Sequence, residues 1–182
     1  MDRTAPAIKE LDAEAAARGV ASLAAVLQAC VAEGASVNFV HPFTQDDAEA
    51  WWRAKVLPAL ARGERRLLVA WGEDGSVVGT AQLELVAMPN QRHRAEVSKV
   101  LVHPGARRRG VARALMLRLE GIAREEGRAL LTLDTVAGSA AQPLYASLGY
   151  ALAGVIPRYA RAAAEARLED TAIMFKELAP AG

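Results

Sequence analysis

The residues best placed to do chemistry lie in one basic stretch, Val100-Leu101-Val102-His103-Pro104-Gly105-Ala106-Arg107-Arg108-Arg109-Gly110-Val111-Ala112. An apolar run ends at the proline, an arginine-rich loop follows, and a helix is expected to begin near Gly110. A helix N-terminus presents free N–H groups and partial positive charge, and small residues at Gly110 and Ala112 let the backbone approach a ligand closely. The side chains of Arg107, Arg108, Arg109 and Arg113 add charged donors. This pattern predicts a pyrophosphate site.

The same stretch is also consistent with a solvated basic turn, because arginine-rich loops before helices are common. A nucleic-acid surface is less consistent with it. The cluster is short, contains no interleaved aromatic residue and belongs to a chain with a formal net charge of +1. The Gly-Lys-Ser/Thr of a Walker loop and the glycine fingerprint of a dinucleotide fold are both absent.

Metal and disulfide chemistry have no support in the residue pattern. The three histidines, His41, His93 and His103, fall on separate expected loops, and no pair has the spacing of metal ligands on a helix. Cys30 is the single cysteine, which excludes an internal disulfide and any multi-cysteine metal site. We therefore expect no metal ion, and a reducing, cytoplasmic location.

The elements that must position the basic stretch follow from hydrophobic periodicity and from turn residues. Helices are expected over residues 12–33, 44–63, 110–126 and 139–148, and strands over 6–11, 67–71, 77–86, 96–102, 129–136, 150–156 and 171–178. A charged loop is expected over 157–170. The order predicts a mixed α/β fold with a central antiparallel hairpin and one strand–helix–strand unit, in one domain over residues 1–182.

Two motifs, together with the distance between them in the chain, resemble the GNAT acetyltransferase superfamily. The family signature Gln/Arg-x-x-Gly-x-Gly/Ala is matched by Arg107-x-x-Gly110-x-Ala112, and a second family element by Ala141-x-x-Leu144-Tyr145-x-x-x-Gly149-Tyr150. The resemblance spans about residues 67–178. It implies an acyl-CoA N-acyltransferase fold, in which a mixed, mostly antiparallel twisted sheet carries helices on both faces.

A narrower resemblance is to the tabtoxin-resistance type of acetyltransferase. The matching stretches are Gly34-Ala35-Ser36-Val37, Ala81-Gln82-Leu83, Pro89-Asn90, Arg94-Ala95-Glu96-Val97, Leu133-Asp134-Thr135, Ala137-Gly138-Ser139 and Thr171-Ala172-Ile173. Resistance to that toxin does not follow, because relatives can share a scaffold and differ in acceptor.

The resemblance implies acetyl-CoA as acyl donor and assigns its contacts. Main-chain groups of Val100, Leu101 and Val102 would pair with the pantetheine arm like an added strand. The N–H groups of residues 108–113, Val111 among them, would hold the pyrophosphate. The Val100 N–H would stabilise the oxyanion, which is typically worth ~3 kcal/mol. The second motif often begins with Asn where this chain has Gly138, so Ser139 is the remaining side chain for that contact.

Catalytic roles follow from the same resemblance. Tyr145 matches the tyrosine that protonates the departing thiolate, and a phenol can donate that proton at neutral pH; the alternative is an aromatic residue packing against the sheet. Glu96 and Asp134 are the candidates for the general base or for binding the substrate ammonium, since two nearby carboxylates raise one pKa. Alternatively, Glu96 pairs with Lys99 or Arg94, and Asp134 binds backbone.

The function expected on these grounds is transfer of the acetyl group of acetyl-CoA, by direct attack, to a primary amine of a small molecule, an amino-acid-like metabolite or a toxin. Protein N-terminal or lysine acetylation and a non-catalytic acyl-CoA sensor are the alternatives. A cleft closed by residues 34–45 and 157–170 would favour the small molecule, and an open groove would favour a peptide. We expect no nucleic-acid or membrane partner, and a monomer or homodimer. The first residues lack the apolar stretch of a signal peptide.

Overall fold

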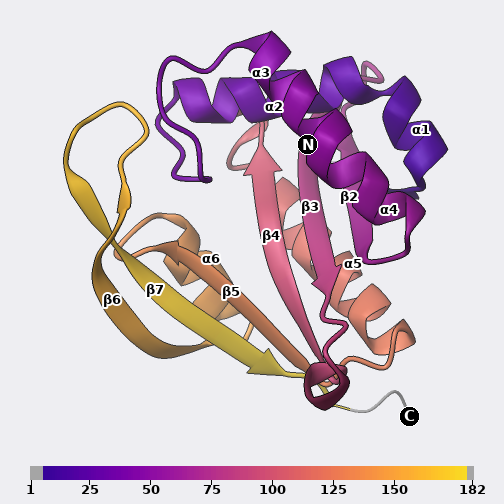
Figure 1. The fold of residues 1–182 in the computed structure, drawn as a ribbon, viewed down its shortest axis with the longest axis vertical. Coiled ribbons are helices and arrows are strands. Elements are labelled where there is room, and N and C mark those ends of the chain that lie inside the picture. Colours follow the sequence, from indigo (N-terminus) through magenta and orange to yellow (C-terminus); the bar gives the residue numbers. More distant parts are fainter. Residues whose placement is uncertain (1–5, 180–182) are drawn as a thin grey trace.

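A twisted seven-stranded sheet of order β1-β2-β3-β4-β5-β7-β6 runs through the computed structural model, which describes residues 6–179 (Figure 1). The strands are β1 (Ala7–Leu11), β2 (Arg65–Trp71), β3 (Val77–Leu85), β4 (Arg94–Val102), β5 (Leu130–Val136), β6 (Ala151–Arg161) and β7 (Leu168–Glu177). Every neighbouring pair is antiparallel except β4 and β5, which are parallel. The mixed, mostly antiparallel sheet expected from the sequence is confirmed.

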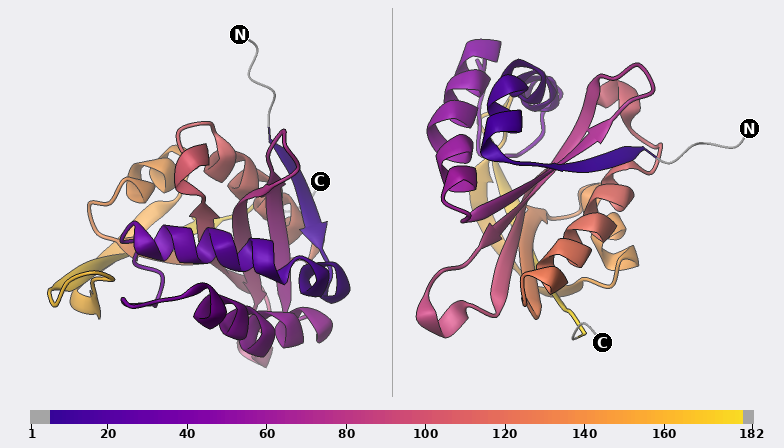
Figure 2. Two further views of the ribbon diagram at one scale, coloured as in Figure 1. Left: turned by 90° about the horizontal axis from the view of Figure 1, so that it is seen from above. Right: turned by 90° about the vertical axis from the view of Figure 1, so that its right-hand side faces the viewer.

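Helices cover both faces of this sheet, as Figure 2 shows from two sides. They are α1 (Ala13–Arg18), α2 (Val20–Ala32), α3 (Gln45–Trp51), the π-helix η1 (Trp52–Val56), α4 (Leu57–Ala61), α5 (Val111–Glu125) and α6 (Ala141–Ser147), with short 3-10 turns η2 (Pro89–Gln91) and η3 (Pro104–Ala106). The helices from α1 to α4 enclose one apolar core, which contains the fully buried Trp52. Helix α5 encloses the second core on the opposite face, with Leu115 and Leu119 at its centre.

Local signals explain most element boundaries. Thr44 begins α3 with a reciprocal capping box, in which its hydroxyl accepts from the Asp47 N–H and the Asp47 carboxylate accepts from the Thr44 N–H. The single helix expected over residues 12–33 is wrong in one respect. Gly19 divides it into α1 and α2, because its N–H closes α1 while its carbonyl accepts the first bond of α2.

The last two strands are longer than expected, so the prediction of a charged loop over 157–170 is wrong at both ends. Strand β6 continues to Arg161 and β7 begins at Leu168. Strand β6 is an edge strand with most of its side chains exposed on both faces, so no apolar alternation marks its second half. A register shift between Ile156 and Ala160 carries the strand past Pro157.

The sheet opens between its two parallel strands. Strands β4 and β5 pair only where Arg94–Glu96 lie beside Leu130–Thr132, and beyond that point the two strands separate (Figure 1). The second half of β4 therefore has β3 as a partner on one side and no strand on the other. The polar backbone groups on that side are available to a ligand.

Candidate active site

A pocket of about 540 Å³ fills the opening between β4 and β5. Most of the residues singled out in the sequence line it: Val100, Leu101, Val102, Arg107, Arg108, Gly110, Val111, Ala112, Arg113, Asp134, Ser139 and Tyr145. Arg109 and Glu96 are the two that do not. The fold thus brings the second half of β4 and the basic loop that follows it to one cavity with the tyrosine motif, although that motif lies far from them in the chain.

One end of the pocket is the N-terminus of α5. Gly110 is the N-cap residue, adopts a left-handed conformation (φ 79°) and leaves the first N–H groups of the helix without a side-chain cap. A Cβ atom built on Gly110 would meet nothing within 4 Å, so the backbone is open to the cavity. A fifteen-residue helix has a developed dipole, and an anion at this end is stabilised.

Arginines surround this helix end. Arg113 donates to the Ser147 hydroxyl at 2.6 Å, and Arg107 donates to the Val102 carbonyl at 3.4 Å. Both side chains also line the pocket with Arg108. The uncapped N–H groups and the arginines together fit the pyrophosphate of a CoA molecule. Arg109 lies in the loop before α5, outside the pocket lining, and its side-chain contact stays a prediction.

A β-bulge in β4 forms the middle of the pocket wall. Thr80 and Gln82 of β3 pair with Leu101 and Ser98, so two residues of β4, Lys99 and Val100, stand opposite a single residue of β3. The bulge reverses the alternation of β4. Before it, the odd-numbered Val97 packs in the α5 core, whereas after it Leu101 packs in the opposite core.

The bulge is a strained feature held by a buried partner. Lys99 has φ 48°, a conformation that costs a residue with a Cβ atom roughly 1–2 kcal/mol. The fully buried Thr80 donates its hydroxyl to the Lys99 carbonyl at 3.2 Å, which supports this backbone. Val100, whose N–H is the candidate oxyanion donor, follows directly. Strain of this kind is a marker of functional sites.

Tyr145 lies on α6 with only 6% of its surface exposed, and it lines the pocket. Burial, with the negative charge of Asp134, raises the pKa of Tyr145 to about 12. The phenol therefore keeps its proton at neutral pH. The ring packs edge-to-face against Tyr150 at 6.0 Å between centroids, which fixes its position. Within residues 6–179 its hydroxyl has no hydrogen-bond partner, so the proton is available to a ligand.

The two candidate carboxylates lie close to one another. Burial raises the pKa of Glu96, and the charges of Glu84 and Asp134 raise it further, against the opposing effect of Arg94. The Arg94 guanidinium is a loose partner for Glu96 at 3.9 Å. Asp134 accepts a long hydrogen bond of 3.4 Å from the Thr171 hydroxyl. Glu96 is half-buried and lies outside the pocket lining, in the row of charges that continues from it.

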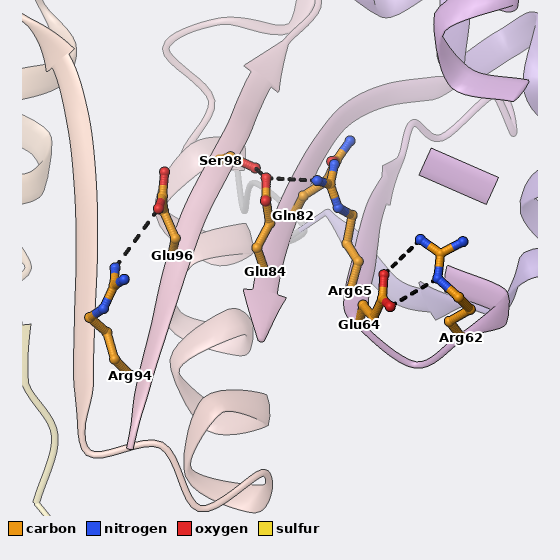
Figure 3. Close-up of polar contacts among 8 residues, drawn as sticks. All are labelled: Arg62, Glu64, Arg65, Gln82, Glu84, Arg94, Glu96 and Ser98. Carbon is orange, nitrogen blue, oxygen red and sulfur yellow. Dashed lines mark hydrogen bonds and ion pairs between the residues drawn. The ribbon is translucent and has the colours of Figure 1, made fainter. Parts of the chain in front are cut away.

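That row crosses three strands on the face of the sheet opposite α5 (Figure 3). Register places Arg65, Glu84 and Glu96 side by side on β2, β3 and β4. Arg65 pairs with Glu84 at 2.8 Å, and Glu84 also accepts from the Ser98 hydroxyl at 2.9 Å. Both of these contacts are made by the Oε1 atom of Glu84, whereas the Glu96 carboxylate has only the loose contact with Arg94.

Lys99 is a pocket residue that the sequence reasoning missed as a site. Its ammonium nitrogen lies 5.9 Å from the Phe39 ring centroid and 5.5 Å from the Trp51 ring centroid. Burial lowers the pKa of Lys99, and the carboxylates around it oppose this effect. An extended strand was expected here, and a lysine within it carries no local signal of a bulge. Trp51 faces this site whereas Trp52 is fully buried, as their adjacent positions on a helix predict.

The smaller contacts complete the lining. The Ser139 hydroxyl lies 3.2 Å from that of Thr135, where it could contact a ligand in place of the missing Asn side chain. The buried Cys30 thiol donates to the Val102 carbonyl at 3.4 Å. Between residues 6 and 179, no group of three or more His, Cys, Asp or Glu side chains is arranged to hold a metal ion. None of the helices in this range combines the length and apolar character needed to cross a bilayer.

Comparison with known proteins identifies the class to which this fold and site belong. The model of the acetyltransferase (GNAT) family matches residues 18–150, which is more than half of the chain. The chain therefore belongs to the GNAT family of acetyltransferases. This finding confirms the family resemblance and the fold expected from the two motifs.

Individual relatives agree with this assignment. An uncharacterized N-acetyltransferase in the hisH-hisA intergenic region of Azospirillum brasilense is 31% identical over 115 residues, which cover 62% of this chain and 66% of that protein, just under two thirds of its length. A ribosomal-protein-alanine N-acetyltransferase from Brucella melitensis is 28% identical with a TM-score of 0.76, covering 94% of this chain and 99% of that one.

Solved structures of lower identity share the fold. An N-acetyltransferase from Staphylococcus aureus Mu50 has a TM-score of 0.77 at 22% identity, with 97% of this chain and 100% of that chain covered. The yncA protein of Salmonella typhimurium, solved with its cofactor acetyl-CoA, has a TM-score of 0.75 at 24% identity, with 98% of this chain and 97% of that chain covered.

Proposed function

We propose that this acetyltransferase transfers the acetyl group of acetyl-CoA to a primary amine of a small molecule by direct attack of the amine. The observation that carries the proposal is the pocket between β4 and β5. It joins an uncapped helix N-terminus, an unpaired strand edge and a buried tyrosine in one cavity. Acetyl-CoA is the acyl donor in this proposal and supplies the activated thioester.

In this proposal, each group of residues has a separate role. The N–H groups of residues 108–113, with Arg107 and Arg113, hold the pyrophosphate. The Val100 N–H, beside the bulge, stabilises negative charge on the thioester oxygen. Tyr145 donates its proton to the sulfur of the leaving group. Glu96 accepts the proton of the attacking ammonium through water, and its raised pKa makes it a stronger base than an ordinary glutamate.

The two loops expected to close the acceptor end of the pocket contact each other, which supports a small molecule as the acceptor. The loop between α2 and α3 reaches the loop between β6 and β7, where the His41 N–H donates to the Ala163 carbonyl at 2.8 Å. Ala35, Ser36 and Val37 of the first loop line the pocket directly. A groove for an extended peptide would need this contact to open. The sequence resembles toxin-resistance acetyltransferases, and this resemblance suggests an amino-acid-like acceptor as the narrower proposal.

Protein N-terminal acetylation is the second candidate. It is favoured by one observation, the 28% identity to the Brucella melitensis ribosomal-protein-alanine N-acetyltransferase over nearly the full chain. A sensor that binds acyl-CoA without turnover is the third. A sensor of this kind would have no use for the buried hydroxyl of Tyr145 or for the raised pKa of Glu96. A cytoplasmic location stays a prediction.

An acceptor panel tests the proposal. We would measure release of the CoA thiol from acetyl-CoA with free amino acids, simple amines and short peptides that present an N-terminal alanine or an internal lysine. The proposal predicts turnover with one or more small amines and little with peptides. Turnover confined to peptides would replace it with protein acetylation. Tight acetyl-CoA binding without release on any acceptor would support the sensor.

A further inference from the structure

Lys99 occupies an unusual place for a lysine. An unbroken β4 would direct residue 99 to the same face as Ala95 and Val97, which is the apolar core under α5. The bulge instead turns the side chain to the opposite face, where it lies over Phe39 and Trp51. The strained backbone and the two rings therefore deliver a positive charge into the pocket.

This ammonium has no direct partner in the described part of the chain. Within residues 6–179 the Lys99 nitrogen makes no hydrogen bond, and no carboxylate oxygen lies within 4.0 Å of it. The nearby carboxylate of Glu84 is held through its Oε1 atom by Arg65 and Ser98 instead. A half-buried ammonium retains three donors, and aromatic rings satisfy its charge but none of its hydrogen bonds.

We propose that Lys99 binds the carboxylate of the acceptor, so that the preferred substrates are amino acids with a free carboxylate close to the reactive amine. This inference rests on the proposed function. The charges around the lysine are divided in the way such a zwitterion needs. Lys99 offers the cation for the carboxylate, and Glu96 and Asp134 offer negative charge for the ammonium. A cationic acceptor without a carboxylate would meet the lysine charge unpaired.

The proposal explains the position of the rings. Phe39 and Trp51 pack edge-to-face at 5.5 Å between centroids, and Phe39 also stacks on Phe43 at 4.4 Å. The three rings come from the loop between α2 and α3 and from α3 itself. They form one aromatic cluster, and the ammonium of Lys99 lies over two of its rings, which favours a positive charge at this position.

The experiment compares each accepted amino acid with its carboxamide, which keeps the amine and removes the negative charge. The wild-type protein should favour the acid in kcat/KM by roughly 10–100-fold, the value of a charged hydrogen-bonded contact. In Lys99→Met, which keeps an apolar stem over the rings, this ratio should fall toward one, chiefly through KM of the acid. Lys99→Arg should retain most of the preference. Lys55→Met, at an exposed lysine of η1, should leave the ratio unchanged.

A binding measurement keeps this inference separate from the proposed function. Calorimetry with CoA-bound protein should show that an amino acid binds and its carboxamide binds weakly, with the difference lost in Lys99→Met. If this pattern holds but no amine is acetylated, the proposed activity is wrong and the carboxylate site stands. The inference is overturned if acid and carboxamide behave alike in the wild-type protein, or if Lys99→Met weakens both equally.

Discussion

At the residue scale, the proposed mechanism needs Tyr145 with its proton and Glu96 without one, and the fold raises the pKa of both groups. Burial of Tyr145 keeps a proton on the phenol, with a pKa of about 12. Burial and like charge around Glu96 raise the pKa of a group that must lose its proton to act as a base. One side chain is thereby held as an acid and the other is strengthened as a base, which is the division that amine acylation requires.

Replacing Tyr145 with phenylalanine removes the proton donor and keeps the ring. We expect turnover to fall by roughly 10²–10⁴-fold, the contribution of a positioned acid, while acetyl-CoA affinity and thermal stability barely change. Tyr150→Phe is the matched control, because its ring lies in the same core but its hydroxyl is outside the pocket lining. Equal turnover in Tyr145→Phe and wild type, under conditions where chemistry limits the rate, would remove the acid role.

Glu96→Gln should show its effect through pH. The base acts when deprotonated, so wild-type activity should rise with pH through the raised pKa of Glu96, above the range of an ordinary glutamate. The variant should lose this limb and recover part of its deficit at high pH, where the amine deprotonates unaided. Glu84→Gln removes a charge that raises the pKa of Glu96, so its rate profile should shift to lower pH. A Glu96→Gln deficit that is constant with pH would indicate a structural carboxylate.

At the element scale, two departures from regular structure build the pocket. Strand β4 leaves β5 after Glu96, and the bulge at Lys99 reverses the alternation of the side chains that follow. Helix α5 then begins at a left-handed glycine that leaves its first N–H groups open. The strand edge and the helix end face the same cavity because a short loop with one 3-10 turn connects them.

Gly110→Glu tests the helix end. A side chain there places bulk and negative charge in the anion site, so we expect acetyl-CoA binding to be lost in calorimetry. Backbone strain alone must be separated from this effect, because Gly110 has positive φ. Gly127→Glu provides that control: Gly127 also has positive φ and open surroundings, but it follows the other end of α5. Similar losses in both variants would assign the effect to strain, and retained affinity in Gly110→Glu would refute the site.

At the scale of the whole molecule, the acceptor side is assembled from segments far apart in the chain. The N-terminal helices supply the aromatic wall, and the loop between β6 and β7 contacts the loop before α3. Some chemistry of the site could be predicted from sequence, because Gly110, its arginines and the tyrosine motif are local signals. The Lys99 site could not, since it depends on pairing with β3 and on aromatic residues about fifty positions earlier.

The second half of β6 is another part of the fold that could not be predicted from the sequence. Its edge position leaves Val155, Ile156 and Tyr159 exposed, so burial imposes no pattern on its residues. The boundary of α5 was predictable to within a residue because one face of the helix is buried and glycine lies at its start. Hydrophobic periodicity in a sequence arises from burial, so an element without a buried face shows little periodicity.

Assembly is a further prediction at this scale. We expect a monomer or a homodimer, because the described residues already enclose the pocket within one chain. Size-exclusion chromatography with light scattering measures the mass directly. A tetramer or larger assembly that persists on dilution would contradict this expectation.

The central claim is that acetyl groups move directly from acetyl-CoA to a small amine in this pocket. Its most direct test is a mass balance, in which CoA thiol, acetylated amine and intact protein are measured by mass spectrometry in one reaction. The account predicts one acetylated amine for each CoA released, and no acetylated protein intermediate. CoA release without acetylated amine would indicate hydrolysis, and transient acetylation of Cys30 or any other side chain would contradict direct transfer.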